Sequence, residues 1–178
     1  MDINYCRATA DEELWGILLL QQKNALDSLT DEEKQQEGFV TVIHTFDLLK
    51  RMNTDCPHII AKVNDKVIGY ALCMTRNFGT DILLLAPMFE TADTLLPGKK
   101  YLAMGQICVA KEYRAQGVFR GMYTYYRQAL EKDYDGLLTE VATNNKRSLN
   151  AHLSVGFEIL QTHVSEDISW ELVYWDWR

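Results

Sequence analysis

The chain has 178 residues, of which 47% are hydrophobic and 24% are charged, and its formal net charge is −7. This length, with this balance of hydrophobic and charged residues, predicts one globular domain over residues 1–178 with a sizeable buried core. The acidic balance argues against a general nucleic-acid binder. The apolar run at residues 14–20 is too short for a membrane span and follows acidic residues, so no membrane contact is expected.

In the first half of the chain, hydrophobic periodicity and turn residues predict five elements. They are a strand at 3–8, a helix from Thr9, a polar loop at 27–36, a helix at 45–53 and a hairpin at 58–75. Thr9 followed by Glu12 is the spacing of a capping box. Thr45 is expected to cap the second helix.

The second half alternates strands and helices after an irregular stretch. The expected elements are an irregular run at 81–96, a strand at 101–110, a helix at 118–132, a strand at 137–143, a helix at 146–155 and strands at 157–163 and 169–177. Pro87 is expected to interrupt the irregular run, and Gly156 to terminate the last helix. This order predicts an α/β fold in which one mixed sheet carries helices on both faces.

The four cysteines are scattered and form neither a CxxC pair nor a Cys/His spacing typical of metal ligands. They are Cys6, Cys56, Cys73 and Cys108. Three lie in apolar, strand-like runs, which favours reduced core thiols in a cytoplasmic protein without a metal site.

The run from Arg114 to Met122 joins an apolar strand to the start of a helix. A tight turn before a helix N-terminus presents several backbone N–H groups to one anion. Gly117 lets the backbone approach a ligand, and Arg114 and Arg120 add charged donors. Taken alone, a turn with a single glycine favours an ordinary strand-to-helix connection with exposed arginines.

A second motif follows on the next strand–helix unit. Asn145, Ser148, His152, Gly156 and Phe157 match the pattern Asn-x-x-[Ala/Ser]-x-x-x-[Tyr/His]-x-x-x-Gly-Phe. The two motifs together resemble the Gcn5-related N-acetyltransferase (GNAT) superfamily, whose acetyl-CoA loop reads [Arg/Gln]-x-x-Gly-x-[Gly/Ala].

The first motif fits that loop at all but one position. Arg114 and Gly117 match, whereas Phe119 stands where Gly or Ala is usual, so its side chain must point away from the phosphates.

The resemblance implies a GNAT fold, with a central mixed sheet of about seven strands flanked by about four helices. It implies acetyl-CoA as co-substrate, bound between the strands at 106–110 and 137–143. The first strand would pair its backbone with the pantetheine arm, and loop amides would hold the diphosphate. The implied cofactor-binding residues are Ile107, Cys108, Val109, Arg114, Ala115, Gln116, Gly117, Val118, Phe119, Arg120, Asn145 and Ser148.

The resemblance also gives His152 a catalytic role, because the residue at this position can protonate the departing CoA thiolate. A thiol has a pKa of about 8.5 and an imidazole one of about 6.5, so an imidazolium near neutrality would suit that role. A half-buried structural histidine is the alternative. Asn145 would bind the pantetheine arm, cap its helix, or do both.

The general base is left open. Many family members carry a carboxylate on the strand before the loop, but Gln106 lies near that place and is not a base. Glu140, water, Glu37 and His44 are the remaining candidates. Basic residues for the CoA 3′-phosphate, or simply solvated, are Lys99, Lys100, Lys111, Lys146 and Arg147.

The C-terminal strand is rich in aromatic residues: Trp170, Tyr174, Trp175 and Trp177. This favours core packing or a homodimer contact over a ligand-stacking wall.

The favoured hypothesis is an N-acetyltransferase that acts on a primary amine of a small molecule or peptide. The alternatives are an inactive CoA-binding or sensor module of the same fold and, more weakly, a structural interaction protein.

Overall fold

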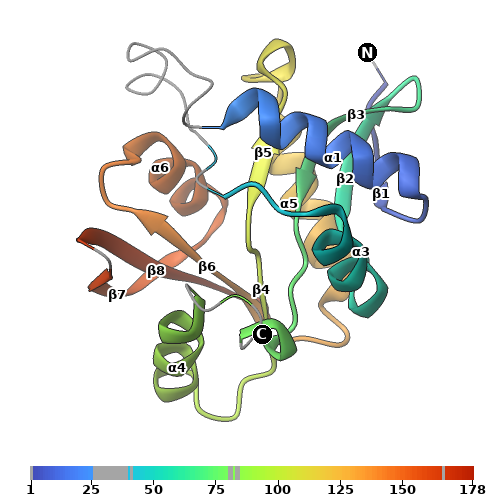
Figure 1. Ribbon diagram of the computed structural model, residues 1–178. Coiled ribbons are helices and arrows are strands. Elements are labelled where there is room, and N and C mark those ends of the chain that lie inside the picture. Colours follow the sequence, from blue (N-terminus) through green and yellow to red (C-terminus); the bar gives the residue numbers. More distant parts are fainter. Residues whose placement is uncertain (1, 26–39, 41, 80–81, 83–84, 166) are drawn as a thin grey trace. The chain divides into compact units, whose positions relative to one another are not determined.

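The computed structural model describes residues 2–25, 40, 42–79, 82, 85–165 and 167–178 (Figure 1). The chain forms two compact units, each built from two segments: Met1–Cys73 with Gln106–Gln128 in unit 1, and Met74–Gly105 with Ala129–Arg178 in unit 2. Each unit has its own four-stranded sheet. The single domain over residues 1–178 stays a prediction.

Unit 1 contains an antiparallel sheet with the strand order β1-β2-β3-β5. Its elements are β1 (Asn4–Arg7), α1 (Asp11–Asn24), α3 (Phe46–Asp55), β2 (Ile59–Val63), β3 (Lys66–Ala71), β5 (Ile107–Val109), a short 3-10 turn (Lys111–Tyr113) and most of α5 (Val118–Leu130).

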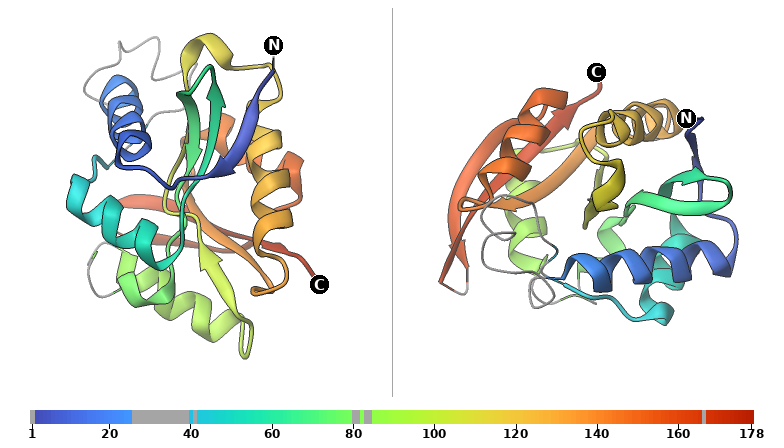
Figure 2. Two further views of the ribbon diagram at one scale, coloured as in Figure 1. Left: turned by 90° about the vertical axis from the view of Figure 1, so that its right-hand side faces the viewer. Right: turned by 90° about the horizontal axis from the view of Figure 1, so that it is seen from above.

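Helices α1 and α5 cover opposite faces of the unit 1 sheet (Figure 2). The register between β2 and β3 shifts between Val67 and Gly69, so these two residues face opposite sides. Gly16 of α1 lies against Val67: an added Cβ would stand 2.9 Å from a Val67 methyl group. Gly69 lies against Met122 of α5, with 3.2 Å between its Cβ position and the sulfur.

Unit 2 contains a mixed sheet with the strand order β4-β6-β8-β7, in which only the β4/β6 pair is parallel. Its elements are a 3-10 turn (Arg76–Gly79), α4 (Ala86–Leu95), β4 (Tyr101–Ala103), β6 (Gly136–Ala142), α6 (Lys146–Val155), β7 (Glu158–Ser165) and β8 (Ile168–Asp176).

Alternation along the strands of unit 2 decides which side chains share a face. Trp175 faces α6, because its ring lies 5.8 Å from that of Phe157, which in turn contacts His152. Glu140 pairs with Leu172, an odd number of residues from Trp175, and therefore lies on the other face. Helix α4 lies on that other side of the sheet (Figure 1).

The α/β class, with strands of both orientations, is confirmed. Where one sheet of about seven strands and about four helices were expected, the described residues form two sheets with eight strands in total and five helices. The difference arises at residues 101–110, which form two strands rather than one. Met104 N–H bonds to Leu138 of unit 2, whereas Gln106 accepts from Leu72 of unit 1, so the chain changes sheets between them.

Two helix starts differ from expectation. Helix α1 begins at Asp11 after the N-cap Ala10, and Glu13 rather than Glu12 closes the first turn. The Glu13 carboxylate accepts from Thr9 N–H at 2.7 Å and from Ala10 N–H at 3.1 Å. Pro87 does not interrupt a helix but stands in the first turn of α4, where its missing N–H is harmless.

Other local predictions are confirmed. Thr45 caps α3 by accepting from Leu48 N–H at 3.3 Å. Gly156 ends α6 at a φ of 125°, a conformation that suits glycine. The hairpin forms with left-handed residues at Asn64 and Asp65. The predicted loop at 27–36 lies outside the described residues.

Candidate functional site

The turn between β5 and α5 has the backbone geometry of an anion cradle. Ala115 and Gly117 take the left-handed conformation, with φ angles of 59° and 81°. Left-handed residues of this kind turn successive N–H groups toward one concavity. Both residues and Gln116 are exposed, and no atom lies within 4 Å of a Cβ position at Gly117. The turn therefore has room for a ligand beside its backbone.

The first turn of α5 adds donors to this cradle. Gly121 N–H bonds to Gly117 O at 2.9 Å, so the amides of residues 118–120 precede the helical ladder and carry the positive end of the helix dipole. The Phe119 ring packs edge-on against the buried Tyr123, with centroids 5.0 Å apart. Its bulk is thus accommodated by a contact along α5.

Arg114 braces the turn from within unit 1. Its Nε donates to Val109 O at 3.0 Å, and one terminal nitrogen donates to Asn24 Oδ1 at 2.5 Å. The guanidinium therefore ties the loop to the end of β5 and to the end of α1.

Strand β5 is an edge strand in the described part of unit 1, since it pairs there with β3 alone. The backbone groups of Ile107 and the N–H of Val109 therefore lie on the side away from β3, where an extended ligand can pair with them. The Cys108 backbone faces β3, and Val109 O accepts from Arg114. Cys108 is buried, and burial raises the pKa of its thiol to about 12, so it is unreactive as a nucleophile.

Hydrogen bonds fix the Gln106 side chain and rule out His44 as the base. The Gln106 amide accepts from the Tyr70 hydroxyl at 2.5 Å and donates to Val42 O at 2.8 Å. Gln21 accepts from His44 N–H at 2.9 Å, so its amide nitrogen is the group 3.1 Å from His44 Nδ1. Nδ1 must then be the acceptor, which leaves the proton of the neutral ring on Nε2. Burial also lowers the pKa of His44 to about 4.

In unit 2, the second motif lies at the start and along one face of α6. Asn145 is the N-cap, and its Oδ1 accepts from Ser148 N–H at 3.2 Å. Its capping role is therefore observed, while its binding role stays a prediction. His152 lies two turns further on, 1% exposed.

The surroundings of His152 differ from those of a free imidazole. Burial lowers its pKa to about 4, so the ring is neutral near pH 7. Its Nδ1 lies 2.7 Å from Ser148 O, an acceptor, so Nδ1 carries the proton. The expectation of an imidazolium near neutrality started from an ordinary pKa, which this buried ring does not have.

Glu140 stands just beyond the end of β4. That strand pairs with β6 only as far as Leu138, and Thr139 closes its end by donating to Met104 O at 2.8 Å. At Glu140 the neighbouring strand in the described residues is β8 alone. Burial raises the pKa of Glu140 to about 7, a value that suits a general base near neutrality.

The remaining candidates are placed more simply. Glu37 lies outside the described residues. Lys99 binds Asp176 at 2.9 Å. The Lys100 ammonium lies 5.0 Å from the Tyr134 ring centroid, and both Lys146 and Arg147 are exposed.

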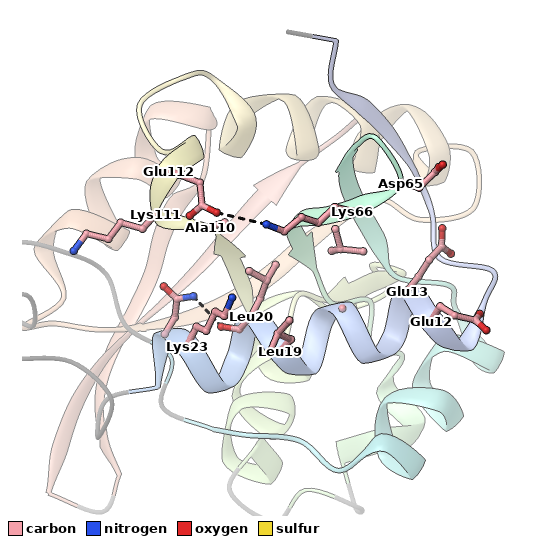
Figure 3. Close-up of a pocket in the computed structure, with 13 residues that line it drawn as sticks. Glu12, Glu13, Leu19, Leu20, Lys23, Asp65, Lys66, Ala110, Lys111 and Glu112 are labelled. Atoms are coloured by element: carbon pink, nitrogen blue, oxygen red, sulfur yellow. Dashed lines mark hydrogen bonds and ion pairs between the residues drawn. The ribbon is translucent and has the colours of Figure 1, made fainter.

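A cavity of about 440 Å³ opens on unit 1 between α1, the β2–β3 turn and residues 110–112 (Figure 3). Its floor is apolar, with Leu19, Leu20 and Val67, and an ion pair of 3.8 Å joins Lys66 and Glu112 at its rim. Of the residues proposed to meet CoA, Lys111 alone lines it. The cavity therefore adjoins the predicted cofactor-binding residues, since Ala110 follows Val109 and Asn24 accepts from Arg114.

The aromatic C-terminal strand packs within unit 2. Trp175 contacts both Phe157 and Trp177, with centroids 5.8 and 5.9 Å apart, and Tyr174 is buried. Core packing is thus confirmed for Tyr174 and Trp177, whereas Trp170 and Trp175 are half-buried, and the homodimer stays a prediction.

Two features were not found from the sequence. The left-handed Ala115 carries no signal, since alanine rarely adopts this conformation. His163 on β7 lies 3.0 Å from Glu140 through its Nε2. These two residues are 23 positions apart, and only the strand register brings them together.

Comparisons with known proteins give one family. The model of the acetyltransferase (GNAT) family matches residues 22–157. No curated protein sequence matches the chain closely enough to count as a relative. Within the described residues, no helix combines the length and apolar character needed to cross a membrane.

Solved structures resemble the whole chain at low sequence identity. The NatC complex bound to Gag peptide and CoA matches at a TM-score of 0.70 and 14% identity, covering 100% of both chains. The ribosomal-protein-S18-alanine N-acetyltransferase from Escherichia coli matches at 0.65 and 13%, covering 98% of this chain and 94% of that one. A Vibrio cholerae spermidine N-acetyltransferase chimera matches at 0.63 and 12%, covering 99% and 96%. These likenesses establish the fold.

Proposed function

The chain belongs to the acetyltransferase (GNAT) family, and on that premise we propose that it transfers the acetyl group of acetyl-CoA directly to a primary amine. The observation that carries the proposal is the exposed amide cradle at Ala115 and Gly117. It supplies the donors that a diphosphate needs, and its left-handed residues hold them in place before any ligand arrives.

Donor binding is assigned mainly to backbone groups of unit 1. The amides of residues 115–120 would hold the diphosphate, and the edge of β5 would pair with the pantetheine arm. Asn145 would add a hydrogen bond from α6. The cradle is exposed, and β5 pairs with a single strand among the described residues, which is what supports this assignment.

Acetyl-CoA supplies an acetyl group on a thioester, which a neutral amine attacks. The amine must lose one proton, and we assign Glu140 as its acceptor. This carboxyl is partly buried, has a pKa near 7, and lies where β6 has lost its β4 neighbour. Each of these features supports a base over a solvated carboxylate.

His152 is kept as the proposed donor of a proton to the CoA sulfur. The neutral ring has no proton on Nε2 to give, so it must first take one from solvent. A thiolate beside it would favour this step, because a nearby negative charge raises the pKa of an imidazole. Glu140 returns its own proton to solvent, and the reaction balances.

The acceptor is proposed to be a small-molecule or peptide amine. Structural neighbours are named for a peptide, a protein alanine and spermidine, which supports this class without choosing within it. A cytoplasmic location is also proposed, supported by four free cysteines.

The test is thiol release from acetyl-CoA across a panel of polyamines, amino acids, aminoglycosides and short peptides. We expect release with at least one amine and an acetylated product by mass spectrometry. Tight acetyl-CoA binding without release on any amine would overturn catalysis and favour the CoA-binding module. Absence of CoA binding by calorimetry would overturn both.

A further inference from the structure

Glu140 and His163 form a pair across the middle strand of unit 2. Glu140 on β6 pairs with Leu172 of β8, and His163 on β7 pairs with Trp170 of β8. Leu172 and Trp170 are two residues apart, so both flanking side chains stand on one face of the sheet. Their Nε2 and Oε1 atoms meet over β8 at 3.0 Å.

The pair is largely withdrawn from solvent. The side chains of His163 and Glu140 are 16% and 11% exposed. Oε1 of Glu140 is fully buried, and within the described residues its recorded polar contact is the one with His163 Nε2. A buried carboxylate without a charged neighbour strongly favours its neutral form. His163 is therefore the described group placed to change that balance.

Resting on the proposed function, we propose that His163 holds Glu140 in the charged form that accepts the amine proton, and so acts as its positioning residue. An imidazolium 3.0 Å from a carboxylate favours the carboxylate, whereas burial alone favours the acid.

Other charges on this sheet face are accounted for. The titratable or charged groups that the described elements place there, apart from the pair, are Tyr101, Asp93, Arg76, Tyr174, Glu158 and Asp176. Arg76 and Tyr101 both bind Asp93, and Lys99 binds Asp176. Glu158 and Tyr174 pair with each other in register two residues beyond Leu172 along β8. Among the described residues, His163 is the titratable group whose ring nitrogen lies beside the Glu140 carboxyl, at 3.0 Å.

The test replaces His163 by glutamine, which stays polar but takes no positive charge. For His163→Gln we expect the acidic limb of the kcat/KM profile to move up by about one pH unit. Activity at pH 6.5 then falls about tenfold and returns to near the wild-type level by pH 9. An equal loss at every pH would mean a merely structural role and would overturn the proposal.

A second measurement needs no acceptor. Carbon-13 labelling of the glutamate carboxyls allows Glu140 to be titrated by NMR in the resting protein, with Glu140→Gln identifying its signal. We expect a higher midpoint in His163→Gln than in the wild type. An unmoved Glu140 midpoint in His163→Gln would overturn the proposal.

The matched control is Thr162→Val. Thr162 is the neighbour of His163 on β7, faces the other side of the sheet and donates to Glu171 at 2.7 Å. We expect it to leave the pH profile in place. A shift as large as that of His163→Gln would show a general effect of β7 and overturn the specific role. If no amine is acetylated, the proposed function fails. The carboxyl titration then still shows whether His163 changes the protonation of Glu140.

Discussion

The two units contribute to the proposed reaction through different parts of the chain. Unit 1 offers backbone: a turn with left-handed residues at Ala115 and Gly117, and the edge of β5. Unit 2 offers side chains whose burial changes their protonation, Glu140 and His152. A backbone donor depends on conformation and tolerates many side chains, whereas a titrating group depends on its own chemistry. Substitutions in unit 1 should therefore change mainly the affinity for CoA, whereas substitutions in unit 2 should change mainly kcat and its pH dependence.

The largest effect is expected from Glu140→Gln. The amide has the shape of the carboxyl but accepts no proton, so kcat should fall about 10²- to 10³-fold. The dissociation constant of acetyl-CoA, measured by calorimetry, should change less than twofold. Glu171→Gln is the control, because Glu171 lies on the other face of the same sheet. A small loss of kcat in Glu140→Gln would show that another group acts as the general base.

A fall in pH should destabilise unit 1 more than unit 2. Burial lowers the pKa values of His44, His58 and His152 to about 4, 3 and 4. Because these folded-state values are depressed, the stability contributed by the neutral rings is complete above pH 6.5 and declines as pH falls toward 4. Each ring should remove about 2 kcal/mol between pH 7.5 and 5.

Unit 1 holds two of these rings and unit 2 one. Amide hydrogen exchange at pH 7.5 and pH 5, compared after correction for the intrinsic rates, measures the loss separately in the two sheets. His152→Gln should flatten the pH dependence in β6 and β8 and leave that of β2 and β3. Equal losses in both sheets would contradict the assignment to individual histidines.

Gly117→Val should weaken acetyl-CoA binding about tenfold. A branched residue at a φ of 81° costs about 1–2 kcal/mol, so the turn rearranges and its amides lose their common direction. Equilibrium binding of CoA measures the loss, and kcat at saturating acetyl-CoA should stay within about threefold. Gln116→Ala is the control, since the exposed Gln116 is proposed to contribute its backbone N–H, which alanine retains.

The smallest effect is expected from Ala115→Gly. Glycine removes the strain of a left-handed alanine, about 1 kcal/mol, and adds chain entropy to the unfolded state in return. The free energy of unfolding should move by less than about 1 kcal/mol, and CoA affinity by less than twofold. A tenfold loss of affinity would show that the Ala115 methyl group itself supports the turn. Unit 1 would then also depend on a side chain, contrary to the contrast drawn between the two units.

Local signals in the sequence predicted what depends on neighbouring residues. Thr45, Asn145 and Gly156 mark helix ends, because each satisfies groups within one turn of itself. The spacing of both motifs also depends only on nearby residues. The sequence therefore predicted the family as well.

Features that depend on distant strands were not predicted. The split at Met104 and Gln106 is decided by partners more than thirty residues away in each sheet. Likewise, the protonation of His152 and Glu140 depends on burial, and the contact with His163 depends on register across β8. Neither burial nor strand register can be deduced from composition and motif spacing.

The discontinuous path of unit 1 sets an order on its folding during synthesis. When a growing chain has emerged only as far as residue 105, β1, β2 and β3 are present, but β5 and α5 are still missing. The outer edge of β3 then lacks its partner, and the face at Gly69 lacks the cover of Met122. Unpaired edges and uncovered apolar faces are the features that invite aggregation. The nascent chain is therefore most vulnerable while the thirty-odd residues that build α4 and β4 are being made.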